Sequence, residues 1–445
     1  MMMSSIVAIV AGLCTALPAI EVTRQDDVAW ILGQTYASLK EDRLARALGV
    51  GNGLGMQYSE DNGRSWSGEQ LISATEKAGE GVRKTAGFDS FFLDPDNGLF
   101  VRFFAESLQK DPTAGKSELD MIISGARTRR MYYQISPDAG RTWGPKLQII
   151  QKGAEYNAEH WVRDVWFGKS QLSMEGRRIL KLRDGTLLAP CQLWPTLEQR
   201  HRVIRKMGAT TGFQFKPGAK DLPDEDWYFL ATCLRGKWRD DLSAIDWESG
   251  GRVLLPWGYT SAGSCGSDEP TLAALDDGRI FCVVRTGSGA LLAELARRKI
   301  AMARYCATSD DGGRSWKDVR PLTFSDGGAL YSCCAYSEFI HSSKNGKWYW
   351  IGNILSEPTY GNNDPRYPLQ IAELDPKTLG IKRDTVTVIQ DRPADEPPFV
   401  RYSNFRVYEE RGSNDFILLL MQDYSELEKN PVKRPGYRYR IKVPE

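Results

Sequence analysis

The chain has 445 residues and is almost neutral, because 58 lysines and arginines balance 57 aspartates and glutamates. This balance excludes a general attraction to nucleic acids or anionic membranes, so any recognition of an anion has to be local. Aromatic residues make up 11% of the chain and there are 42 glycines, which is typical of a sheet-rich protein with many tight turns. The eight Cys have no C-x-x-C spacing and there are only three His, so we expect no metal site and no cofactor.

Residues 5–20 form an uncharged apolar run that is too short to span a bilayer. The run is typical of the apolar part of a signal peptide, which would make the protein secreted or periplasmic. No Lys or Arg precedes it, and the cleavage site at residues 17–19 is weak. The alternative is an N-terminal strand or packing segment, and both interpretations stay open. We expect no membrane span elsewhere, because no other apolar run is long enough.

The pattern Ser-x-Asp-x-Gly-x-x-Trp occurs three times, beginning at Ser59, Ser136 and Ser309. Its Ser and Asp side chains can bond nearby backbone N–H groups, and its Gly allows the positive φ of a tight turn. The Trp can then pack its large apolar face between strands. We therefore interpret the repeat as a structural hairpin turn and assign it no catalytic role.

A second repeat consists of a turn followed by a short apolar run, which is typical of a buried strand. Its five turns lie at residues 96–98, 184–185, 277–278, 345–346 and 413–415. Residues 372–379 look like a decayed copy of the first repeat, and residues of about 195–245 are predicted to be an insertion near the rim. The last turn has no Ser-x-Asp repeat after it, and the first Ser-x-Asp repeat has no such turn before it. This complementarity predicts a ring whose two chain ends meet in one blade.

The Ser-x-Asp repeat is similar to the Asp-box, and the chain resembles the sialidase (neuraminidase) superfamily. The resemblance implies an all-β fold: a six-bladed β-propeller of the sialidase type with Asp-box turns. Residues 21–445 would form this single domain, with the insertion at about 195–245. Function in such propellers lies on loops at one end of the central channel.

Four residues of the second half match the order of functional residues in that family. Glu269 follows Gly266-Ser267-Asp268, Arg285 comes 16 residues later, Arg366 precedes an apolar strand, and Tyr402 stands in Arg401-Tyr402-Ser403-Asn404. The resemblance implies that Tyr402 is the nucleophile, Glu269 its base, and Arg285 and Arg366 part of a carboxylate clamp. Guanidinium groups suit this clamp because they grip a carboxylate with paired hydrogen bonds. A neutral Tyr suits attack on a carbon that carries a carboxylate, which would repel an anionic nucleophile.

The first half departs from the family. It has no Phe-Arg-Ile-Pro segment to supply the first clamp Arg, and Arg24 is the nearest candidate. The position of the general acid, before the first repeat, reads Val50-Gly51-Asn52-Gly53. Asp42 or Asp164 could replace that acid, and His160 and Arg163 accompany Asp164 as candidate substrate ligands. The alternative for residues 160–164 is an inter-blade loop with an internal Arg–Asp pair.

We expect an exo-acting glycoside hydrolase that releases a terminal acidic sugar, with sialic acid the first candidate, from a glycan or glycoconjugate. One alternative is a polysaccharide lyase on uronate-containing glycans, with His160 and Tyr402 or Tyr156 as its proton-transfer residues. The other is a non-catalytic carbohydrate-binding propeller, because fold does not imply function. A monomer is expected.

Overall fold

The computed structural model describes thirteen stretches of the chain: residues 19–25, 36–39, 42–50, 53–110, 126–174, 178–194, 229–256, 259, 266–286, 299–333, 335–360, 364–424 and 436–445. The predicted signal-peptide run lies almost wholly outside these residues. Within them, no helix has both the length and the apolar character needed to cross a membrane.

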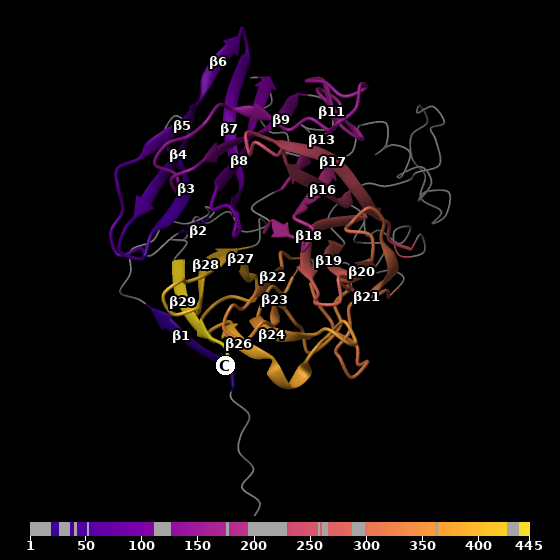
Figure 1. The fold of residues 1–445 in the computed structure, drawn as a ribbon. Helices are drawn as coiled ribbons and strands as arrows, with labels where there is room; N and C mark the ends of the chain where they lie inside the picture. Colours follow the sequence, from indigo (N-terminus) through magenta and orange to yellow (C-terminus); the bar gives the residue numbers. More distant parts are fainter. Residues whose placement is uncertain are drawn as a thin grey trace, which may run out of the picture.

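The described strands form six antiparallel sheets around a central axis, the blades of a propeller (Figure 1). From the axis outward, blade I contains β2 (Tyr36–Ser38), β3 (Leu44–Val50), β4 (Gly53–Ser59) and β5 (Gln70–Ala74). Blade II contains β7 (Val82–Leu93), β8 (Phe100–Lys110), β9 (Arg127–Ser136) and β10 (Leu147–Gln148), and β6 (Glu76–Gly79) pairs with β7. Blade III contains β13 (Gln171–Ser173), β15 (Leu187–Trp194), β16 (Leu230–Trp238) and β17 (Ile245–Val253), and β14 (Leu180–Lys181) pairs with β15.

The second half of the chain builds the other three blades in the same way. Blade IV contains β18 (Ser267–Ala274), β19 (Ile280–Thr286), β20 (Tyr305–Ser309) and β21 (Lys317–Pro321). Blade V contains β22 (Glu338–His341), β23 (Trp348–Asn353), β24 (Leu369–Asp375), β25 (Gly380–Ile381) and β26 (Thr387–Gln390), with a 3-10 turn at Arg383–Thr385. Blade VI contains β27 (Val400–Glu409), β28 (Phe416–Tyr424), β29 (Gly436–Lys442) and β1 (Glu21–Gln25). A separate hairpin, β11 (His160–Val162) with β12 (Val165–Trp166), lies between blades II and III in the chain.

The two chain ends meet in blade VI, where β1 pairs with β29 from Glu21 opposite Lys442 to Gln25 opposite Arg438 (Figure 1). The predicted closure within one blade is thus present. The closing strand is β1, however, and not the first Ser-x-Asp repeat, which belongs to the separate blade I. The turn that precedes β3 in blade I contains Asp42 and no Gly or Asn, so the repeat pattern did not reveal it.

The three Ser-x-Asp turns join the third and fourth strands of blades I, II and IV. In the first, Ser59 Oγ donates to Asp61 Oδ1 at 2.8 Å and accepts from Gly63 N at 2.7 Å. Asp61 Oδ1 also accepts from Ser65 N at 2.8 Å. The other two turns repeat these bonds with the equivalent residues. The turns therefore close on themselves and lie away from the axis, which agrees with a structural role.

The predicted insertion at about 195–245 extends too far toward the C-terminus. Residues from Leu230 onward form β16 and β17, the outer strands of blade III. Trp238, expected at the rim, ends β16 and donates from Nε1 to Asp94 Oδ2 at 2.7 Å. Residues 195–228 lie outside the described part of the chain.

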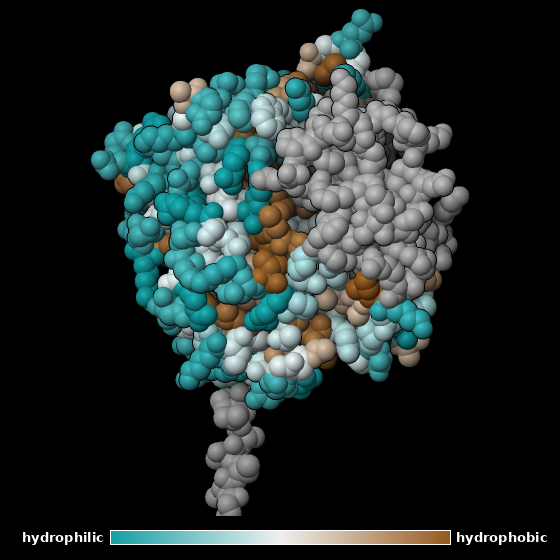
Figure 2. All heavy atoms as spheres, turned by 90° about the vertical axis from the view of Figure 1, so that its right-hand side faces the viewer, coloured by the Kyte–Doolittle hydropathy of each residue, from teal (hydrophilic) through white to brown (hydrophobic). Residues whose placement is uncertain are grey.

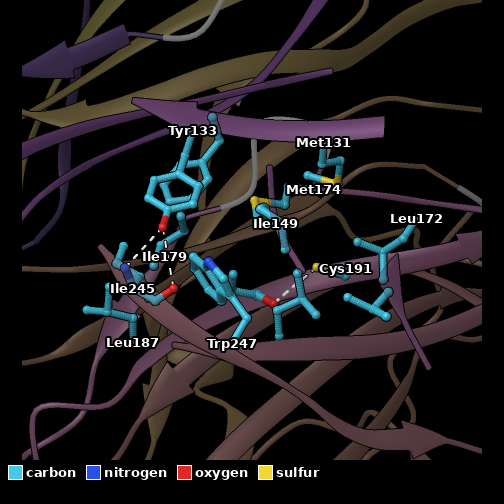
Figure 3. Packing of buried hydrophobic residues seen from close by; sticks show 14 of the residues in the cluster. Met131, Tyr133, Ile149, Leu172, Met174, Ile179, Leu187, Cys191, Ile245 and Trp247 are labelled. Atoms are coloured by element: carbon cyan, nitrogen blue, oxygen red, sulfur yellow. Dashed lines mark hydrogen bonds between the residues drawn. The ribbon is translucent and has the colours of Figure 1, made fainter. Parts of the chain in front are cut away.

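Apolar side chains pack between adjacent blades, and Figure 3 shows one such cluster between blades II and III. The Tyr133 hydroxyl accepts from Ile245 N at 3.0 Å and donates to Ile245 O at 3.4 Å. The ring of Trp247 packs edge-on against Tyr133, with centroids 6.0 Å apart. Burial of such large rings supplies most of the cohesion between blades. The side of the ring in Figure 2 is mainly hydrophilic, with a narrow hydrophobic strip among its described residues.

Candidate functional site

Six inner strands surround the channel, and all of them run in the same direction. Residues at or just beyond their C-terminal ends line one cavity. The N-terminal ends of β18 and β27 therefore lie together at the opposite end of the ring, which we call the entry end. The end with the turns between first and second strands is called the turn end. All four residues from the second half lie at the entry end. Glu269 and Tyr402 stand at the starts of the inner strands β18 and β27, and Arg285 stands at the end of β19. Arg366 lies in the loop between the second and third strands of blade V.

Glu269 and Arg285 form an ion pair. Arg285 Nη1 lies 2.8 Å from Glu269 Oε1, and its Nε lies 3.9 Å from Asp268 Oδ1. The pairing of β18 with β19 shifts register between Asp268 and Thr271, and Glu269 has a φ of 42° there. In a regular strand, neighbouring side chains would point to opposite faces. The irregularity instead allows both carboxylates to approach Arg285.

Arg366 and Arg401 are neighbours across a parallel bridge between blades V and VI. Arg401 donates from Nε and Nη2 to the two carboxylate oxygens of Asp364, at 2.7 and 2.8 Å. Arg366 Nη1 donates to Ser403 Oγ at 3.4 Å. Arg401 was not predicted as a site residue. Its position beside Tyr402 in the quoted segment is the signal that could have indicated it.

Tyr402 is fully buried and packs in the apolar cluster shared by blades V and VI. Its backbone N donates to Arg366 O at 2.9 Å. Burial raises the pKa of the Tyr402 hydroxyl, and nearby Tyr437, Glu396 and Tyr424 raise it further. The Tyr402 hydroxyl has no hydrogen-bond partner among the described residues, so it makes no direct bond to Glu269, the expected base.

Two of the first-half candidates lie far from the entry-end residues. Arg24 is in β1, the outermost strand of blade VI, with its guanidinium 4.2 Å from the centre of the Tyr437 ring. Three strand spacings, roughly 14 Å, separate β1 from the inner strand. Asp42 is exposed in the turn between β2 and β3, at the turn end. Neither Arg24 nor Asp42 therefore lies beside Glu269 or Arg366.

The remaining first-half candidates belong to the β11–β12 hairpin. Asp164 accepts from Arg252 Nη2 at 2.6 and 2.7 Å, and Arg252 lies in β17, the outer strand of blade III. Arg163 donates from Nη2 to the backbone of Gly250 in the same strand. The His160 ring stacks on Trp166 with centroids 4.5 Å apart. The hairpin is thus fastened to the outer edge of blade III. Asp164 pairs most closely with Arg252, and the predicted internal pair is also present, because Arg163 Nε lies 3.7 Å from Asp164 Oδ2.

The structure also bears on metal binding. Among the described residues, no group of three or more His, Cys, Asp and Glu side chains is placed to hold a metal ion.

The fold is similar to that of solved propeller structures. A protein of unknown function from Dyadobacter fermentans aligns with a TM-score of 0.57 and 12% identity, over 96% of this chain and all of that one. A Trypanosoma rangeli sialidase aligns with a TM-score of 0.52 and 10% identity, over 92% of this chain. The aligned part is 54% of the sialidase, so this chain spans about half of its length.

A second sialidase shows the same likeness. The K499G mutant of NanB sialidase from Streptococcus pneumoniae aligns with a TM-score of 0.52 and 12% identity, over 96% of this chain and 70% of NanB. No protein family model and no curated protein matches the chain. At these identities the likeness establishes the fold alone: the chain is a six-bladed β-propeller of the type found in sialidases.

Proposed function

We propose that the chain binds a terminal acidic sugar of a glycan at the entry end and hydrolyses its glycosidic bond, with sialic acid as the first candidate. One observation carries this proposal: Arg366 and Arg401 lie side by side at the end of the ring that also holds the Glu269–Arg285 pair. Two arginines whose backbones are joined by a bridge can bring two guanidinium groups to one carboxylate, which suits an acidic sugar better than a neutral one.

The neighbours of these arginines fix their orientation. Asp364 holds Arg401 through two hydrogen bonds, and Ser403 accepts from Arg366. A guanidinium held in this way loses little freedom when a ligand binds. Arg285 is held in the same way by Glu269, and its side chain is 17% exposed. The substrate carboxylate would bind to Arg366 and Arg401, with the sugar ring directed toward Glu269.

For the chemical step we retain Tyr402 as the nucleophile implied by the family resemblance. Its oxygen would attack the anomeric carbon as the bond from that carbon to the aglycone oxygen breaks, and its proton would pass to a carboxylate. The aglycone would leave as its oxyanion and take a proton from solvent. Water would later hydrolyse the glycosyl–enzyme bond, which releases the sugar and restores Tyr402. Because burial raises the pKa of Tyr402, attack requires a base close to its hydroxyl. Glu396 borders the same cluster, because its Oε2 accepts from Tyr424 at 3.0 Å and Tyr424 packs against the cluster. Glu396 acts on the Tyr402 hydroxyl electrostatically and is therefore a second candidate for that base, beside Glu269 from the family resemblance.

The experiment is hydrolysis of an aryl sialoside by the wild type and by the variants Arg366→Met and Arg401→Met. Loss of one arm of a carboxylate clamp should lower kcat/KM on the order of 100-fold. The matched control is Arg141→Met, because Arg141 is exposed in the second Ser-x-Asp turn, and this variant should keep full activity.

Three results would contradict the proposal. Unchanged turnover in the Arg366 and Arg401 variants would show that these arginines do not bind the substrate carboxylate. A product that absorbs in the ultraviolet, formed from a uronate glycan, would show a lyase instead. Glycan binding without turnover on any sialylated or uronic substrate would show a binding protein.

A further inference from the structure

A second candidate site lies in the channel itself. A cavity of about 890 Å³ runs from the turn end, where the fully exposed Asp276 stands, to the middle of the ring. All six blades contribute to its wall. Its volume lies within the range of small-molecule sites. It is distinct from the entry end, because Glu269, Arg285, Arg366 and Arg401 are absent from its lining.

Two residues of the cavity wall, Arg178 and Glu338, form a polar group with Tyr336. Arg178 Nη2 lies 3.2 Å from Glu338 Oε1 and donates to Val407 O at 3.1 Å. The other oxygen of Glu338, Oε2, accepts from the Tyr336 hydroxyl at 2.6 Å. The Glu338 side chain is only 6% exposed. Both of its oxygens are therefore engaged, and its single negative charge is compensated by Arg178.

Arg406 adds a second positive charge to the same wall. Its Nη1 donates to the backbone of Phe405 at 2.9 Å, and its guanidinium lies 5.8 Å from the centre of the Tyr336 ring. No carboxylate of the described residues forms an ion pair with Arg406. Two arginines thus share one carboxylate, and this part of the wall carries a net positive charge.

Both arginines also have an unused donor. The Nε atoms of Arg178 and Arg406 are buried and have no hydrogen-bond acceptor among the described residues. A buried donor without an acceptor is unfavourable, and it is most unfavourable when the group is charged. Because both Nε atoms are closed off from solvent, a ligand in the cavity would reach the terminal nitrogens of the two guanidinium groups instead.

We propose that this cavity binds a small hydroxylated carboxylate, such as a sugar acid, between Arg178 and Arg406. The carboxylate would accept from both guanidinium groups, because paired N–H donors match its two oxygens. Aromatic side chains elsewhere on the wall, among them Tyr36, Phe91 and Trp348, suit the apolar face of a sugar ring. This site is independent of the hydrolysis proposed at the entry end.

The test is titration calorimetry with sodium glucuronate, with methyl glucoside as the neutral counterpart and sodium sulfate as the simple anion. Glucuronate should bind the wild type, whereas methyl glucoside should not bind and sulfate should bind at least tenfold more weakly. The main variant is Arg406→Met, which keeps an apolar stem and leaves no carboxylate unpaired. It should weaken glucuronate binding by about tenfold or more.

Two further variants make the result specific. Arg183→Met removes a charge at the exposed opening of the same cavity and should bind glucuronate as the wild type does. Arg366→Met alters only the entry end and should also leave this binding unchanged. Glucuronate affinity that falls in Arg366→Met but not in Arg406→Met would overturn the cavity site and leave the proposed function standing. Absence of glucuronate binding, or equal affinity for sulfate, would overturn it as well.

Discussion

Arg401 and Asp364 are joined by two parallel hydrogen bonds of 2.7 and 2.8 Å, which fasten the inner strand of blade VI to the loop before β24 of blade V. Both side chains are largely buried, at 14% and 20% exposure. We predict that Asp364→Asn lowers the free energy of unfolding by about 1–3 kcal/mol, because it leaves a largely buried guanidinium without its counter-charge. Urea denaturation measures this change.

The matched control for that prediction is Asp326→Asn. Asp326 also binds an arginine, Arg383, but both side chains are about half exposed. Exposed pairs contribute about 0–1 kcal/mol, so this variant should change stability much less. If both variants lost the same free energy of unfolding, the buried Arg401–Asp364 pair would contribute no more to stability than the exposed Arg383–Asp326 pair.

Tyr402 is predicted to be required for turnover and not for binding. Tyr402→Phe keeps the buried ring and should abolish aryl sialoside hydrolysis while the affinity for free sialic acid changes less than about threefold. Tyr439→Phe is the control, since Tyr439 is equally buried and bonds to Gln390 in the same cluster. Steady-state kinetics measure the turnover of the aryl sialoside by both variants, and calorimetry measures their affinity for free sialic acid. Full turnover in Tyr402→Phe would eliminate the nucleophile assignment.

Substrates with poor leaving groups should react slowly. The segment that carries the general acid in sialidases reads Val50-Gly51-Asn52-Gly53 in this chain. Asp42 lies at the turn end, and Asp164 is bound to Arg252 on the outer strand of blade III, away from the axis. Without strong protonation of the departing oxygen, the rate depends on the acidity of the leaving alcohol. We therefore predict that a nitrophenyl sialoside is cleaved at least about 100-fold faster than an alkyl sialoside. Similar rates for the two would show that another residue of the protein protonates the leaving group.

The Ser-x-Asp turns should stabilise the protein above about pH 4. Although burial acts in the opposite direction, hydrogen bonds from Ser315 and Ser309 lower the pKa of Asp311 from 3.8 to about 2. A carboxyl whose folded pKa is depressed stabilises the fold above its unfolded pKa, and this contribution is lost as the pH falls toward 2. We predict a loss of about 1 kcal/mol for Asp311, a value reduced for solvent screening.

Denaturation of wild type and Asp311→Asn at several pH values checks this prediction. The variant should be less stable at pH 7, and the difference should shrink between about pH 4 and pH 2. Asp240→Asn, at an exposed position outside the Ser-x-Asp turns, is the control and should follow the wild type throughout. A pH-independent difference for Asp311→Asn would contradict the titration.

The fold could be predicted from the sequence because its main signals are local. Each Ser-x-Asp turn closes through its own side chains, so the spacing in the sequence equals the spacing in the structure. Blade I was harder to recognise, because its inner turn at Asp42 contains no Gly or Asn. The outer strands of blade III were mistaken for part of an insertion for a similar reason: they follow a long segment, 195–228, that separates them from β15.

The candidate site was predicted only in part. Order along the chain correctly places Glu269, Arg285 and Arg366 at one end of the ring, because each blade repeats the same path. Sequence spacing does not encode distance from the axis, which is why Arg24 and Asp164 proved to lie on outer strands or beside them. Nor does spacing reveal a register shift such as the one that precedes Thr271.

A crystal structure of the protein with bound N-acetylneuraminate would show whether Arg366 and Arg401 hold the sugar carboxylate. We predict that the sugar carboxylate lies within hydrogen-bonding distance of both Arg366 and Arg401, with the anomeric carbon facing the Glu269 side of the entry end. A sugar bound only in the channel cavity beside Arg406, or at a place where neither Arg366 nor Arg401 touches its carboxylate, would contradict the central claim.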